Sequence, residues 1–204
     1  MKTPLTVGVL VSGRGSNLRA LLGAFPAGHP LVRIVVVVSN RPGCVALGYA
    51  REAGIPVEIV NREDYSSRDA QQSAMAAALA AAEVDLVVLA GYDQVLGPSL
   101  LEPFAGRIIN VHPSLLPVFG GTLHAQAAAL QHGVKVTGCT VHFVTAAVDG
   151  GPIIAQAAVP VRDDDTVDTL SLRILAQEHI LLPRTVALIA EGKVRVEGRR
   201  VRVG

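Results

Sequence analysis

Short apolar segments rich in valine and isoleucine alternate with amphipathic segments along the first half of the chain. Continuous apolar runs of this kind are typical of strands buried on both faces of a parallel sheet. The expected strands are residues 6–11, 32–38, 57–60, 86–89 and 107–111, and the expected helices are residues 18–24, 44–53, 67–83 and 123–131. This alternation of strand and helix predicts a doubly wound α/β arrangement.

The second half of the chain has a different pattern. The expected elements are strands at 137–143 and 153–159, a helix at 166–190 capped by Asp165 or Thr166, and a hairpin at 193–203. The turn-prone run Asp149-Gly150-Gly151-Pro152 joins the two strands. The sequence therefore predicts an α/β fold with a mostly parallel, doubly wound sheet and an antiparallel C-terminal part. Because no linker or repeat interrupts the chain, we expect one domain over residues 1–204.

The composition limits the class of protein. Half of the 204 residues are hydrophobic, 17% are charged and the formal net charge is +1, so we expect no basic surface for nucleic acid. Polar or charged residues interrupt every apolar run well short of about 18 residues, which argues against a membrane span. The start Met1-Lys2-Thr3-Pro4-Leu5 leads into the first strand, so we expect no signal peptide and a cytoplasmic protein. Cys44 and Cys139 form no CxxC pair and offer no zinc framework.

A glycine-rich turn, Ser12-Gly13-Arg14-Gly15-Ser16-Asn17, lies between the first expected strand and a helix. This order directs backbone N–H groups and a helix N-terminus toward a phosphate. The turn lacks a Gly-Lys-Ser/Thr ending, which excludes a triphosphate-binding loop. The second strand ends in Ser39-Asn40 and not in an acidic residue, which argues against a dinucleotide site. From the pattern alone, the turn is either a site for a phosphate monoester or an ordinary connection.

Asn110-Val111-His112-Pro113 lies at the C-terminal end of an expected strand, where open α/β sheets bind ligands. Asn110 and His112 are two residues apart and therefore project to the same side. An amide donor beside an imidazole can stabilise an oxyanion and transfer a proton. Asp149 follows a later strand and is expected at the same edge of the sheet, where a carboxylate would orient the ring. By spacing alone, a structural histidine and a turn aspartate remain open alternatives.

Taken together, these motifs resemble the phosphoribosylglycinamide formyltransferase family of folate-dependent enzymes, which have the formyltransferase fold. The matching pieces are residues 12–17, 110–117, 138–144, 148–152 and 177–179, which occur in the family's order over nearly the whole chain. The Asn-x-His pair and the downstream aspartate resemble formyl-folate enzymes in general. The Ser-Gly-x-Gly-Ser-Asn turn is typical of the glycinamide ribonucleotide branch.

The resemblance implies transfer of a formyl group from 10-formyltetrahydrofolate to the amine of 5-phosphoribosylglycinamide, in purine (IMP) biosynthesis. It implies direct attack of the amine, with His112 and Asn110 stabilising the oxyanion of a tetrahedral intermediate and Asp149 assisting proton transfer. It implies no metal and no covalent nucleophile. The ribonucleotide would be bound by Gly15, Ser16, Asn17, Gln177 and Glu178. Folate would be bound by Arg68, Asp93, Gln94, Val95, Leu96, Asn110, Thr145, Ala146, Ala147, Val148 and Asp149. The N-terminal half would thus bind the ribonucleotide phosphate, and the C-terminal half would bind folate and carry catalysis.

The sequence departs from the family pattern at two places. Asp93-Gln94 stands where members of the family commonly have Met-Arg, which puts the folate side chains there in question. The segment from Phe119 to His124 is one residue longer than usual and contains Thr122, so His124 is a weaker match than His112. We interpret His142, inside an expected strand, as a buried hydrogen-bonded residue.

Three alternatives differ in their sequence requirements. A formyltetrahydrofolate hydrolase usually has an additional N-terminal domain, and this chain begins directly at the first strand. A methionyl-tRNA formyltransferase has an additional C-terminal domain and a basic surface, for which Arg199, Arg200 and Arg202 are too few. A non-catalytic phosphoribosyl-binding module has no need of a proton-transferring histidine. We therefore expect small-molecule substrates as the only partners, with no nucleic acid and no membrane, and a monomer or homodimer.

Overall fold

A computed structural model describes residues 3–204, and the chain divides into two compact units, residues 1–109 and residues 110–204. Met1 and Lys2, which belong to the segment used to argue against a signal peptide, lie outside the described residues. The expectation of one domain over residues 1–204 stays a prediction. No helix within residues 3–204 is long and apolar enough to cross a membrane.

The first unit contains four parallel strands in the order β3-β2-β1-β4. They are β1 (Leu5–Val11), β2 (Val32–Ser39), β3 (Val57–Ile59) and β4 (Leu86–Leu89). All four residues of β4 and six of the seven residues of β1 are buried. This burial is the physical reason for the continuous apolar runs, because helices cover both faces of the sheet.

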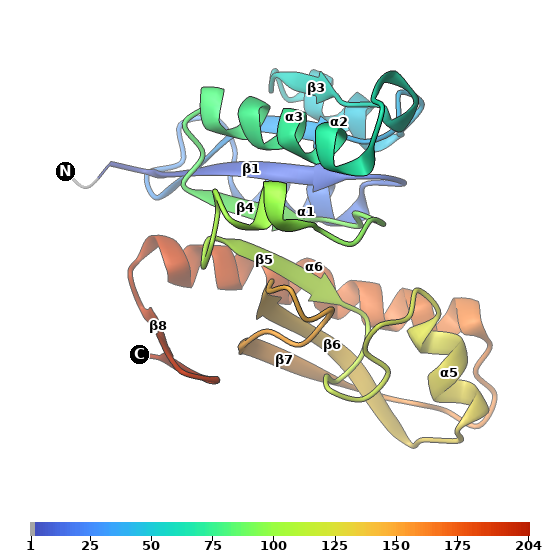
Figure 1. Cartoon of the computed structure of the whole chain (residues 1–204). Coiled ribbons are helices and arrows are strands. Elements are labelled where there is room, and N and C mark those ends of the chain that lie inside the picture. Colours follow the sequence, from blue (N-terminus) through green and yellow to red (C-terminus); the bar gives the residue numbers. More distant parts are fainter. Residues whose placement is uncertain (1–2) are drawn as a thin grey trace. The chain divides into compact units, whose positions relative to one another are not determined.

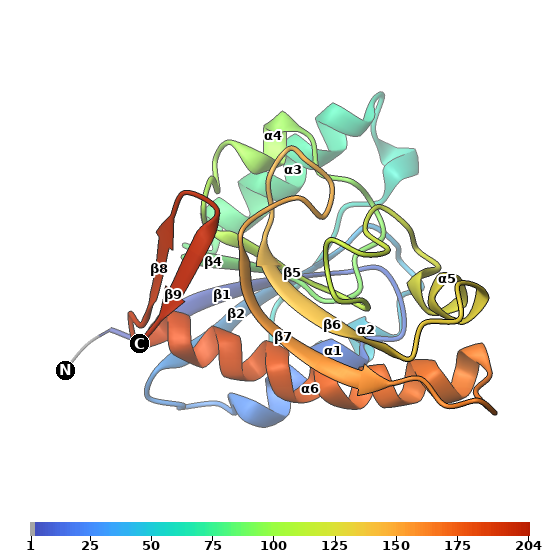
Figure 2. The ribbon, with the colours of Figure 1, turned by 90° about the horizontal axis from the view of Figure 1, so that it is seen from below.

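The helices of the first unit are α1 (Ser16–Ala24), α2 (Ala46–Glu52), α3 (Arg68–Ala81) and α4 (Pro98–Leu101), with a short 3₁₀ turn at Arg62–Asp64. In Figure 2, α1 and α2 lie on one side of β1, β2 and β4, whereas α3 and α4 lie on the other side. The doubly wound arrangement is therefore confirmed. The sequence pattern did not predict α4 or the 3₁₀ turn, because each is shorter than two turns of helix.

The second unit contains three sheet strands in the order β5-β6-β7, with β6 antiparallel to β7, and a separate two-stranded sheet, β8-β9. Its elements are β5 (Ile108–His112), which begins at the end of the first unit, α5 (Ala125–Gln131), β6 (Val136–Phe143), β7 (Ile153–Pro160), α6 (Val167–Ala190), β8 (Val194–Glu197) and β9 (Arg200–Val203) (Figure 1). Thr166 caps α6 by accepting a hydrogen bond from the Thr169 N–H. Of the two caps that the sequence predicted, Asp165 and Thr166, the structure has Thr166. The α6 helix packs on β6 and β7. The antiparallel C-terminal part and the terminal hairpin are confirmed.

Candidate active site

His112 ends β5 with both ring nitrogens facing hydrogen-bond acceptors. Its Nδ1 lies 3.3 Å from Oδ2 of Asp149, and its Nε2 lies 2.9 Å from the Phe119 carbonyl oxygen. A carboxylate and a carbonyl oxygen only accept, so the ring donates to both at once only when it is doubly protonated. The His112 side chain is 7% exposed, so water does not easily replace either partner. This environment suits a residue that presents a positive charge and a mobile proton.

Asp149 lies in a left-handed turn after β6, with φ of 49°. Aspartate tolerates this conformation better than most residues. Its Oδ2 accepts a hydrogen bond of 2.8 Å from the Gly121 N–H, and its Oδ1 lies 3.6 Å from Nε2 of His142. A Cβ on Gly151 would lie 1.8 Å from the Phe143 carbonyl oxygen, so the turn closes tightly only with glycine at that position. The carboxylate is thereby fixed between two imidazoles.

The surroundings of Asp149 favour its ionised form. The interaction with His142 is the largest cause of a pKa below the ordinary value, although burial acts in the opposite direction. The Gly121 N–H and the charge of His112 lower the pKa of Asp149 further. A carboxylate that stays ionised can orient an imidazolium and can take part in proton transfer.

His142 belongs to the same cluster, which the sequence interpretation missed. It is buried, as expected, but its Nε2 lies 3.3 Å from the Asn110 amide nitrogen and its Nδ1 lies 2.9 Å from the Phe143 carbonyl oxygen. The carbonyl fixes the proton on Nδ1. A neutral His142 therefore accepts from Asn110, whereas a protonated one donates toward Asp149. Its place at the carboxyl end of β6, seven residues before Asp149, was the available sequence signal.

Hydrogen bonds from a residue of β6 hold the segment that follows β5 in place. Thr140 donates a hydrogen bond of 2.7 Å to the Ser114 carbonyl and accepts one of 3.0 Å from the Leu116 N–H. Gln156 on β7 donates to the Leu116 carbonyl as well. These bonds fix the segment that brings the Phe119 carbonyl to His112. His124 is exposed, immediately precedes α5, and makes no contact with the cluster among the described interactions.

The glycine-rich turn of the first unit forms a helix N-terminus. The α1 helix begins at Ser16, two residues earlier than expected, so Ser16 and Asn17 lie in its first turn. No side chain caps α1 and no acidic residue lies in its first turn. Gly15 has φ of 74°, and a Cβ there would lie 2.5 Å from Cβ of Ala46, so only glycine fits. This geometry is favourable for an anion, because neither a capping side chain nor an acidic residue of the first turn offsets the positive end of the helix dipole.

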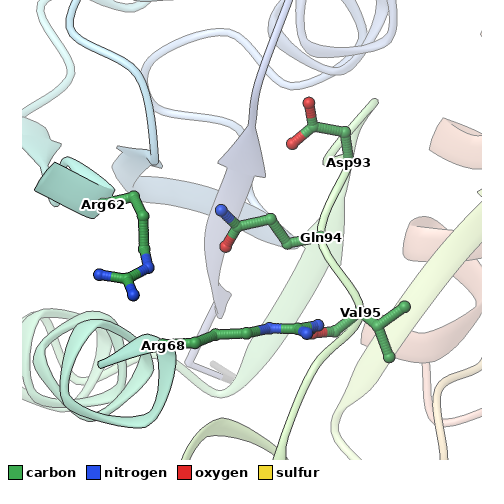
Figure 3. Close-up of a pocket in the computed structure, with 5 residues that line it drawn as sticks. All are labelled: Arg62, Arg68, Asp93, Gln94 and Val95. Carbon is green, nitrogen blue, oxygen red and sulfur yellow. The ribbon is translucent and has the colours of Figure 1, made fainter.

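A pocket of about 360 Å³ lies in the first unit, lined by Arg62, Arg68, Asp93, Gln94 and Val95. Four of these residues are among those that the resemblance assigned to folate, and Arg62 is an addition. Leu96 is 7% exposed and lies in the core instead. Figure 3 shows the Arg68 side chain extending along the pocket to Val95 and the Gln94 amide pointing into the space between Asp93 and Arg62. The two arginines make the pocket suitable for an anionic ligand.

The remaining candidate residues lie in the second unit. Residues 145–148 form an exposed turn before Asp149, closed by a hydrogen bond of 3.0 Å from the Gly150 N–H to the Ala147 carbonyl. Gln177 and Glu178 lie on α6, and Glu178 is buried.

Burial and the charge of Glu178 raise the pKa of the Cys139 thiol to about 12, so this thiol is not a nucleophile at neutral pH. Within residues 3–204, no group of three or more His, Cys, Asp or Glu is arranged to hold a metal ion.

Residues 5–186 match the formyl transferase family. The chain is 49% identical to phosphoribosylglycinamide formyltransferase of Mycobacterium tuberculosis, over 98% of this chain and 92% of that protein. It is 42% identical to the trifunctional purine biosynthetic protein adenosine-3 of Homo sapiens, over 96% of this chain. The chain spans only 14–19% of the length of the trifunctional relatives, which are much longer proteins.

Solved structures of such enzymes are also similar to this chain, in both sequence and fold. The crystal structure of glycinamide ribonucleotide transformylase 1 from Symbiobacterium toebii is 50% identical and has a TM-score of 0.94, over 100% of this chain and 95% of that one. Phosphoribosylglycinamide formyltransferase from Anaplasma phagocytophilum is 44% identical, with a TM-score of 0.91 over 98% of this chain and 93% of that one. The predicted fold class is thus confirmed for the whole chain.

The pKa of Asp149 leads to a prediction about stability. Because folding lowers this pKa, the stabilising contribution of Asp149 is fully present above its unfolded-state pKa of about 4 and is lost as the pH falls through the lower folded-state value. Chemical denaturation of the wild type and of Asp149→Asn should therefore give unfolding free energies whose difference changes most between pH 5 and pH 2. A difference that is constant over that interval would contradict the assignment.

Proposed function

The chain belongs to the formyl transferase family, in the branch of the phosphoribosylglycinamide formyltransferases, and on that premise we propose its reaction. The chain transfers the formyl group of 10-formyltetrahydrofolate to the amine of 5-phosphoribosylglycinamide in purine biosynthesis. The observation that carries the proposal is His112, held between Asp149 and the Phe119 carbonyl with Asn110 two residues before it on β5. This is the donor arrangement that formyl transfer needs.

The chemistry follows from that arrangement. The substrate amine attacks the formyl carbon, a C–N bond forms, and the carbonyl oxygen becomes an oxyanion. The positive charge of the His112 imidazolium stabilises this oxyanion electrostatically, and the second N–H of the Asn110 amide donates a hydrogen bond to it. As the bond between the formyl carbon and N10 of folate breaks, Nε2 of the His112 imidazolium gives up its hydrogen bond to the Phe119 carbonyl and donates its proton to N10. The neutral imidazole that remains, oriented by Asp149, accepts the proton that the attacking nitrogen loses, which restores the imidazolium.

The remaining assignments are proposals about binding. The ribonucleotide phosphate binds to the N-terminus of α1 at Gly15, Ser16 and Asn17, and Gln177 and Glu178 contact the ribonucleotide. For folate, the proposed contacts in the first unit are Arg68, Gln94 and Val95, and the proposed contacts in the second unit are Asn110 and residues 145–149. The uncapped α1 helix and the pocket with two arginines support these assignments, because both substrates carry negative charge. The protein acts in the cytoplasm on small molecules, as a monomer or homodimer.

The activity is tested by mixing the purified protein with both substrates and following deformylated folate by its absorbance. We expect turnover that requires the ribonucleotide. Turnover without the ribonucleotide would instead identify a formyltetrahydrofolate hydrolase. If no turnover occurs with or without it, the chain would be a non-catalytic binding protein.

His112→Ala and Asp149→Asn should each lower kcat by at least about 10², because each removes a group that acts on the oxyanion or on the proton. The circular dichroism spectrum should stay that of the wild type. His29→Ala is the matched control, since His29 accepts hydrogen bonds from backbone N–H groups of the first unit and takes no part in the cluster. Near-wild-type kcat in either variant would disprove the mechanism.

Ser16→Ala should raise KM for the ribonucleotide about tenfold and leave kcat within a factor of about two, because a hydrogen bond to a charged group is lost. Ser73→Ala, which changes an exposed serine on α3, is the control. Steady-state kinetics with varied ribonucleotide measures both constants. An unchanged KM in Ser16→Ala would mean that the turn is only a connection.

A further inference from the structure

The Asp93 carboxylate makes its contacts within the protein, although Asp93 lines the pocket of the first unit. Its Oδ1 accepts a hydrogen bond of 3.0 Å from the Asn40 amide, and its Oδ2 forms an ion pair with Arg41. Asn40 and Arg41 directly follow β2, whereas Asp93 follows β4. Both carboxylate oxygens are thus engaged by residues of a different loop.

The short segment that contains Asp93 is anchored at both ends. At its start, the Asp93 N–H donates to Oγ of Ser12 at 3.1 Å. At its end, the Val95 carbonyl accepts from Arg68 and from Nε2 of Gln72, at 3.0 Å for the latter, so α3 holds it. Gln94 lies between the two anchors, with its side-chain oxygen 3.1 Å from the Tyr92 hydroxyl. The position of residues 93–95 therefore depends on the Asp93 contacts on one side and on α3 on the other.

We propose that Asp93 is a positioning residue for folate and does not contact it: its carboxylate, held by Asn40 and Arg41, sets the conformation of the pocket-lining segment 93–95. The inference rests on the proposed function, since it takes a formyl-folate as the ligand of the pocket. It also explains how an acidic residue is tolerated there. Folate carries carboxylates, and an unpaired Asp93 would repel them, whereas the Arg41 guanidinium neutralises that charge.

The two contacts of Asp93 differ in strength. Arg41 is 59% exposed, so its ion pair with Asp93 contributes little by itself. Asn40 is 3% exposed, and loss of its acceptor would leave a buried amide donor without a partner, which is costly. The Asn40 hydrogen bond therefore contributes most of the positioning. Asp93→Asn keeps an oxygen for Asn40 and loses only the charge, so its effect should be smaller than that of Asp93→Ala.

The test is steady-state kinetics of the full chain, first with varied 10-formyltetrahydrofolate at saturating ribonucleotide and then with varied ribonucleotide at saturating 10-formyltetrahydrofolate. We expect Asp93→Ala to raise KM for 10-formyltetrahydrofolate about tenfold with kcat within a factor of about two. Asp93→Asn and Arg41→Gln should each raise KM for 10-formyltetrahydrofolate about two- to threefold. The double variant should have a KM no higher than that of either single variant, because both substitutions remove the same ion pair. Titration calorimetry of 10-formyltetrahydrofolate with each variant checks the same order by binding alone.

Asp163→Ala is the matched control, because it removes an exposed aspartate whose ion pair with Lys135 resembles that of Asp93 with Arg41. It should leave KM unchanged. The inference would be overturned by an unchanged folate KM in Asp93→Ala, by an equal rise of KM for both substrates, or by additive effects of Asp93→Asn and Arg41→Gln. An inactive wild type would contradict the proposed function instead, and the calorimetric comparison would still test the positioning of the pocket.

Discussion

The Asp149 carboxylate is the group around which the second unit is organised. A charge with little exposure to water is stable only when donors replace the water, and here the Gly121 N–H and the rings of His112 and His142 face its oxygens. Each of these donors comes from a different segment of the chain. The turn after β6, the end of β5 and the segment before α5 must therefore all adopt their positions for one carboxylate to remain ionised.

The same requirement explains the role of residues with no obvious chemistry. Thr140 on β6 ties down the backbone of Ser114 and Leu116, and this segment leads to the Phe119 carbonyl that faces His112. Because β6 also supplies His142, one strand fixes both the ring partner of Asp149 and the acceptor for His112. The hydrogen bonds that hold the protons of the cluster in place thus depend on the position of β6 and not only on the reacting side chains.

The first unit follows a different principle, in which backbone conformation matters more than side-chain charge. Gly15 gives α1 an uncapped start because no Cβ fits beside Ala46. The pocket, in contrast, combines arginines with an aspartate, and the contact of Asp93 with Asn40 and Arg41 keeps that aspartate from opposing an anionic ligand. The Asp93-Gln94 pair, taken from the sequence as a departure in folate contacts, is held by contacts within the protein.

The sequence by itself determined the strands, the longer helices, the doubly wound order and the shared direction of Asn110 and His112. These features follow from periods of two and 3.6 residues, which are local properties of the chain. Only the tertiary structure decided that His142 joins Asp149, that the Phe119 carbonyl faces His112, and that Asp93 points to Asn40. The close approach of Gly15 to Ala46, which leaves no room for a Cβ, was decided in the same way. Each of these depends on the path of a loop between distant residues, which no local period encodes.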